Sequence, residues 1–185
     1  MDEFSRIRPR LEEIIKRSPV PEDYLHASNI LKWLKTLKQD PDPGLNLAAF
    51  AHDIERAVPG RRVRKGDYPD FRSFKLAHAW NSARIIREIL SEEGFNEDFI
   101  GRIHHLVANH EFGGDEESDL IMCADSLSFF DVNINLYLTR HSLEEVKERA
   151  QWSYQKLPPR LKKTVQDLLT RREKADILFP HSSNC

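Results

Sequence analysis

The sequence is poor in several features that mark broad classes of protein. Only two of its 185 residues are cysteine, Cys123 and Cys185, so we predict no disulfide framework and expect a cytoplasmic protein. A membrane-spanning helix needs about 20 consecutive apolar residues, and no apolar run here approaches that length. The N-terminus has no signal or transit pattern, so no membrane partner is expected. A net charge of −2 gives no broad basic surface, which argues against a nucleic-acid polymer as partner.

The sequence also lacks the signatures of two common hydrolase types. It has no Gly-x-Ser-x-Gly nucleophile elbow and no phosphate-binding P-loop, so neither of these chemistries is predicted. No segment alternates apolar and polar residues convincingly as a strand, whereas apolar residues recur at helical spacing along the chain. We therefore predict an all-α protein, a single-domain bundle of about seven or eight helices.

Breaker residues and capping patterns divide this helical pattern. Pro21 suits a first helical turn, and Pro158-Pro159 opens a last helix. Ser142-Leu-Glu-Glu145 is a capping box. The other predicted helices include residues 6–17, 45–58, 71–93, 96–110 and 116–130. Within one domain, we assign 1–20 to an N-terminal helix, 21–135 to a metal-binding core, 136–178 to C-terminal helices that complete the domain, and 179–185 to a disordered tail.

Residue types that commonly bind metals occur at intervals along the helices. The pair His52-Asp53 ends an apolar stretch, although adjacent residues on one helix point about 100° apart. Asp125 follows an apolar run, where an unpaired buried carboxylate would be costly. Each histidine taken alone is as well explained by core packing, but successive helices of a bundle commonly present ligands to one interior site. The full series is His26, His52, Asp53, His78, His110 and Asp125.

This series resembles the pattern of the HD-domain metal-dependent phosphohydrolases, in which a His, a His-Asp doublet and a distant Asp bind metal. Two-metal branches of that family add two further His. The matching contexts are Leu25-His26-Ala-Ser-Asn-Ile-Leu31, Ala51-His-Asp-Ile54, Val107-Ala-Asn-His-Glu-Phe-Gly-Gly114 and Cys123-Ala-Asp-Ser-Leu127. The resemblance implies one ion held by His26, His52, Asp53 and Asp125, and a second completed by His78 and His110, with Asp53 bridging. His105 is the alternative to His110.

Imidazole and carboxylate ligands without cysteine suit one or two divalent transition ions, namely iron, manganese, zinc, cobalt or nickel, better than magnesium. Asp53 and Glu55 are the predicted catalytic residues, with Glu55 as a candidate general base. Glu111 either orients a ligand imidazole or is a solvated acid. The basic segment after the doublet either binds substrate phosphates or is an ordinary solvated loop. Its candidate phosphate-binding residues are Arg56, Arg61, Arg62, Arg64 and Lys65.

We therefore expect a phosphohydrolase that cleaves a phosphomonoester or phosphoanhydride of a small nucleotide-like substrate with metal-activated water. The Glu-Asp pair of the family's guanosine tetraphosphate hydrolases and the Gly-Tyr-Pro motif of its cyclic-dinucleotide members are both missing here. Two alternatives are a di-iron oxygenase, similar to the inositol-oxygenase branch, and a non-catalytic module that senses a nucleotide or metal. The C-terminal helices carry Trp152 and Tyr154 on a face that either packs on the bundle or forms a homodimer contact.

Overall fold

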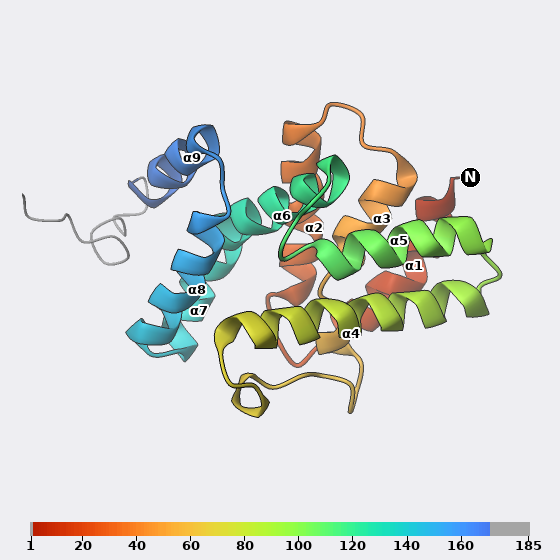
Figure 1. The fold of residues 1–185 in the computed structure, drawn as a ribbon, viewed down its shortest axis with the longest axis horizontal. Coiled ribbons are helices and arrows are strands. Elements are labelled where there is room, and N and C mark those ends of the chain that lie inside the picture. Colours follow the sequence, from red (N-terminus) through yellow and green to blue (C-terminus); the bar gives the residue numbers. More distant parts are fainter. Residues whose placement is uncertain (1, 171–185) are drawn as a thin grey trace, which may run out of the picture. The chain divides into compact units, whose positions relative to one another are not determined.

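The computed structural model describes residues 2–170 of the chain. The regular secondary structure in this range is helical (Figure 1). These residues contain no strand, which confirms the all-α prediction. A π-helical turn, Phe129–Asn133, joins α6 directly to α7, so the nine labelled α-helices of this range form eight separate segments. The helices are α1 Glu3–Lys16, α2 Asp23–Leu37, α3 Pro43–Ala51, α4 Phe71–Glu92, α5 Glu97–Asn109, α6 Glu116–Ser128, α7 Ile134–Arg140, α8 Leu143–Gln155 and α9 Pro159–Thr170.

The chain divides into two compact units, Met1–Asp125 and Ser126–Cys185. The sequence instead suggests a core that extends to residue 135 and C-terminal helices that complete the same domain, and this division stays a prediction. The expected disordered tail, 179–185, lies outside the described residues. None of the helices in residues 2–170 combines the length and the apolar character that crossing a bilayer requires.

The first unit is built from α1 to α5 and most of α6. Helices α4 and α5 lie antiparallel and side by side, joined by a short turn in which Gly94 has a φ of +70° (Figure 1). Four helices begin where a side-chain oxygen accepts a backbone N–H of the first turn, which satisfies donors that the helix leaves unpaired. The caps are Asp2 of α1, Asp42 of α3, Asp70 of α4 and Asn96 of α5. Buried core residues include Leu11, Ile30, Leu47, Ile86 and Ile103.

The helix that carries the His-Asp pair is shorter than the predicted 45–58, and this prediction was wrong. Helix α3 ends at Ala51, His52 is its C-cap, and Asp53 has left the helical conformation, with φ −102° and ψ 14°. A 3₁₀ turn, Ile54–Ala57, follows. On a continuous helix the two side chains would diverge by about 100°. Ending the helix between them lets both side chains point to one place.

The second unit contains α7, α8 and α9. The predicted capping box is present at the start of α8: the backbone N–H of Glu145 donates to Oγ of Ser142, and the N–H of Ser142 donates to Oε2 of Glu145. The sequence pattern does not predict α7, which continues from the π-helical turn. Lys156 lies over the ring of Trp152 and Lys162 over that of Tyr154, so contacts within this unit engage both aromatic residues. A homodimer contact through this face stays a prediction.

Candidate metal centre

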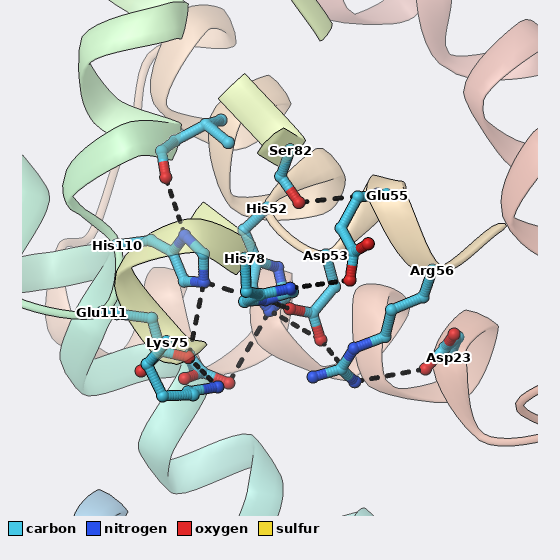
Figure 2. A network of polar contacts seen from close by, with 12 residues as sticks. Asp23, His52, Asp53, Glu55, Arg56, Lys75, His78, Ser82, His110 and Glu111 are labelled. Carbon is cyan, nitrogen blue, oxygen red and sulfur yellow. Dashed lines mark hydrogen bonds and ion pairs between the residues drawn. The ribbon is translucent and has the colours of Figure 1, made fainter. Parts of the chain in front are cut away.

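Six ligand-type side chains, all in the first unit, meet at one largely buried place. Figure 2 shows four of them, His52, Asp53, His78 and His110. Five of the six are no more than 2% exposed, and Asp53 is the most accessible at 12%. Each side chain comes from a different segment. His26 lies on α2, His52 at the end of α3, Asp53 in the turn after it, His78 on α4, His110 at the end of α5 and Asp125 on α6. The structure thus brings together every metal ligand predicted from the sequence.

The first group of donors consists of His26, His52, Asp53 and Asp125. The two histidine Nε2 atoms lie 3.2 Å apart, and Oδ1 of Asp125 lies 3.1 Å from His26 Nε2 and 3.6 Å from His52 Nε2. Oδ2 of Asp53 lies 3.5 Å from His52 Nε2 and 4.0 Å from His26 Nε2. Ligand bonds of about 2.0–2.1 Å place neighbouring donors about 3.0–3.5 Å apart in octahedral or tetrahedral sites. The three shorter separations lie within about this range and the other two slightly above it, so these side chains could hold one metal ion.

Two imidazoles are fixed by backbone carbonyls behind them. Nδ1 of His52 donates to the carbonyl of Ala49 at 2.8 Å, and Nδ1 of His110 donates to that of Val107 at 2.7 Å. Each Nε2 then faces the cluster with its lone pair. His110 Nε2 is buried and has no hydrogen-bond partner in the described structure. This is the arrangement in which a ligand histidine is held by its other ring nitrogen.

A second group of donors lies on the other side of Asp53. Oδ1 of Asp53 is 2.7 Å from Nε2 of His78 and 3.9 Å from Nε2 of His110, whereas its Oδ2 faces the first group. Oε1 of Glu111 lies 3.6 Å from His110 Nε2. The two oxygens of Asp53 thus face two candidate metal positions, as the predicted bridging role requires. Within the described residues, buried His, Asp and Glu groups able to hold a metal ion occur on both sides.

Local electrostatics hold Asp53 and His110 in forms that bind metal. Burial alone would raise the pKa of Asp53, but the charges of Arg56, His52 and His78 bring it well below 3.8. Burial lowers the pKa of His110 to about 4. At neutral pH Asp53 is therefore a carboxylate and His110 a neutral imidazole, and metals bind these deprotonated forms.

Glu55 lies behind a candidate ligand. Its Oε1 accepts a hydrogen bond from Nδ1 of His78 at 2.9 Å (Figure 2), and its Oε2 accepts one from the backbone N–H of Val63 at 2.8 Å. Both oxygens are engaged, and the side chain is buried. These contacts favour positioning of His78 and anchoring of the following loop over the predicted general-base role, which stays a prediction.

The five predicted phosphate-binding residues have different surroundings. Nη1 of Arg56 lies 2.8 Å from Oδ2 of Asp53 and 3.5 Å from Oδ1 of Asp23, so this guanidinium borders the cluster. Arg61 instead forms a bidentate pair with Glu88 of α4, at 2.7 and 3.0 Å. The remaining three, Arg62, Arg64 and Lys65, are exposed. The structure therefore brings only Arg56 of this set into contact with the candidate ligands.

The sequence left open whether His110 or His105 is a ligand, and it did not indicate that Lys75 belongs to the site. His110 lies in the cluster, whereas His105 is 58% exposed and pairs with Asp115, so His110 has the position expected of a ligand. The missed residue is Lys75, which is buried and forms an ion pair with Glu111. Its place one helical turn before His78, on the same face of α4, was the available signal.

The candidate centre lies in a part of the chain that matches a known protein-family model. That model, described as a domain of unknown function (DUF4202), matches residues 1–178. The chain belongs to the DUF4202 family. No curated protein and no solved structure matches it. The matched residues include all six candidate ligands.

Proposed function

We propose that this DUF4202 chain is a metal-dependent phosphohydrolase of the HD-domain type. The observation that supports it is the convergence of six His and Asp side chains, five of them buried, from five helices and one turn, with ring nitrogens fixed from behind. The resemblance of their sequence contexts to that family supports the same reading. Burying so many polar side chains together is costly unless they are paired or bind a metal. The cofactor proposed is one or two divalent transition ions, such as iron, manganese, zinc, cobalt or nickel.

The positions of these residues suggest a different role for each group of them. His26, His52, Asp53 and Asp125 would hold the ion, and Asp53, the most exposed of the ligands, marks the side from which a substrate approaches. When bound, such an ion generates hydroxide at neutral pH and polarises phosphoryl oxygens. Arg56 is 20% exposed on that side and would turn its guanidinium from Asp53 to substrate oxygens, which it can bind bidentately.

The proposed substrate is a small phosphate ester or anhydride, of which nucleotides are the favoured class. The exposed cations Arg62, Arg64 and Lys65 follow the ligand doublet in the chain and would attract an anionic substrate to this side by long-range charge. Glu88 binds both terminal nitrogens of Arg61, so a phosphate would have to compete with this carboxylate, and the predicted phosphate-binding role of Arg61 stays a prediction.

Metal analysis beside a phosphate-release assay tests this function. We expect purified protein, loaded with Mn²⁺ or Fe²⁺, to retain metal and to release phosphate from a panel of nucleoside mono-, di- and triphosphates. Asp53→Ala should lose both properties, and Asp67→Ala, which removes an exposed acid from the same region, should lose neither. Full activity in Asp53→Ala would contradict the proposal. Oxygen uptake with bound iron and without phosphate release would favour a di-iron oxygenase instead.

A further inference from the structure

Lys75 carries a positive charge inside the candidate centre. It lies on α4 one turn before His78, and its side chain is only 2% exposed. Its Nζ forms an ion pair with Oε1 of Glu111. Figure 2 shows this pair on one side of the imidazoles and Arg56 with Asp23 on the other. Lysine is almost never fully buried unless it is paired, and here Glu111 is its partner.

The Lys75–Glu111 pair lies at the second candidate metal position. The donors there are His78, His110 and Glu111, together with Oδ1 of Asp53. Glu111 is the carboxylate of that group, and Lys75 already neutralises it. Nε2 of His78 is hydrogen-bonded to Oδ1 of Asp53 at 2.7 Å. The carboxylate of the second position is thus already paired with a buried ammonium.

The first candidate position has a different arrangement. Nε2 of His26 and Nε2 of His52 face each other at 3.2 Å, and both approach Oδ1 of Asp125. Because Nδ1 of His52 donates to the Ala49 carbonyl, its Nε2 presents a lone pair to this group. A cation also borders this group: Nη1 of Arg56 lies 2.8 Å from Oδ2 of Asp53, and the Arg56 side chain is 20% exposed. The two positions therefore differ in the burial of their neighbouring cation, because Arg56 is partly exposed and Lys75 is only 2% exposed.

From this difference we propose that the centre takes one divalent ion, at His26, His52, Asp53 and Asp125, and that the ammonium of Lys75 supplies the second positive charge. The inference rests on the metal centre of the proposed function and narrows its one or two ions to one. A second divalent ion beside Lys75 would be repelled in a poorly screened interior and would have to displace the lysine from Glu111. Lys75 is then a positioning residue that holds Glu111 and sets the metal content.

Counting bound metal in Lys75 variants tests this inference. The full chain and Lys75→Met are loaded with excess Mn²⁺, desalted and measured by elemental analysis and by electron paramagnetic resonance. We expect one ion per wild-type chain, with the spectrum of an isolated Mn²⁺. Lys75→Met should take up a second ion, because Glu111 becomes available as a ligand, and should give the spin-coupled spectrum of a close pair. Lys75→Arg, which keeps the charge, should stay at one ion.

The double variant Lys75→Met/Glu111→Gln is the matched control. It removes both charges, so it leaves no unpaired buried ion and offers no second carboxylate, and it should bind one ion. Two ions in the wild type would overturn the inference without any variant, and so would a single ion in a folded Lys75→Met. No metal in the wild type would instead overturn the proposed centre itself. One ion without phosphate release would leave this inference standing and contradict only the proposed activity.

Discussion

Asp125 is the carboxylate that two imidazoles enclose. Its Oδ1 lies 3.1 Å from Nε2 of His26 and 3.6 Å from Nε2 of His52, and its side chain is 1% exposed. Asp125→Asn keeps the size of the side chain and removes its charge. We expect the affinity for Mn²⁺ to fall by more than about 100-fold, since even groups behind a ligand are worth about 10–100-fold. Isothermal titration calorimetry measures this change.

Asp119 offers a control on the same helix. Its exposed carboxylate accepts the backbone N–H of Gly114 at 3.0 Å and lies outside the ligand cluster. Asp119→Asn should therefore bind Mn²⁺ as the wild type does. Wild-type affinity in Asp125→Asn would remove Asp125 from the ligand set.

The variant Glu55→Gln tests whether Glu55 positions His78 or acts as a general base. Its two oxygens accept hydrogen bonds from His78 and Val63, and an amide has only one acceptor oxygen, so Glu55→Gln must lose one of these bonds. We expect the Mn²⁺ affinity to fall about 10-fold, at the lower end of the range for groups that orient ligands. Turnover at saturating Mn²⁺ should stay within a few-fold of wild type.

The general-base hypothesis predicts the opposite result for Glu55→Gln. Metal affinity would be unchanged, and phosphate release at saturating Mn²⁺ would be lost. Measuring affinity and turnover separately therefore decides between the two roles. Glu88→Gln, which changes an exposed acid that pairs with Arg61, should alter neither quantity.

Among the helices, Arg102 of α5 connects two elements that carry ligands. Its guanidinium binds both oxygens of Asp42, the N-cap of α3, at 2.9 and 2.7 Å, and also binds Glu117 in the first turn of α6. Arg102→Met keeps the apolar stem but removes these bonds. We expect the free energy of unfolding to fall by about 1–2 kcal/mol. This is less than charge-assisted hydrogen bonds would contribute in a buried site, because Arg102 is 37% exposed and solvent screens its charge. Urea unfolding measures this loss.

The effect of Arg102→Met should depend on pH. Hydrogen bonds from Arg102 lower the pKa of Asp42 below 3.8 in the folded state. This contribution is complete above that pH and is lost as the pH falls through the lower folded value. The difference between wild type and variant should therefore be smaller at pH 3 than at pH 7. Arg87→Met, which breaks an exposed pair with Glu97, should cost about 0.5 kcal/mol or less at pH 7, and an equal cost for both variants would contradict the connecting role.

The sequence could predict most helices, because capping residues such as Asn96 and Ser142 act locally. It could not predict where α3 ends. Helical spacing continues past Ala51, and the end depends on the bond from His52 back to the Ala49 carbonyl and on partners for Asp53 that are distant in sequence. Lys75 was missed for the same reason, because its burial depends on an ion pair with Glu111 of another segment.

For the whole chain, the pattern of ligand types was more informative than any single motif. Each histidine had a plausible explanation as a packed core residue, and only the order of six positions favoured a shared site. The structure brings these six side chains together from segments up to 99 residues apart, the separation of His26 and Asp125. The chemistry of the substrate is not contained in that pattern, since one ligand set serves both hydrolysis and oxygen chemistry.

A metal held by several helices should stabilise the unit that contains it. Binding to the folded state alone adds about 2.7 kcal/mol at a free metal concentration 100 times Kd, which corresponds to a rise of about 5–10 °C in Tm for a chain of this size. All six candidate ligands lie in Met1–Asp125. Hydrogen exchange with and without Mn²⁺ should therefore show added protection in α2 and α5 but little in α8. Chelation with EDTA should reverse the effect, and Asp53→Ala should abolish it. Equal protection of α8, or protection that survives in Asp53→Ala, would mean that Mn²⁺ acts somewhere other than the proposed centre.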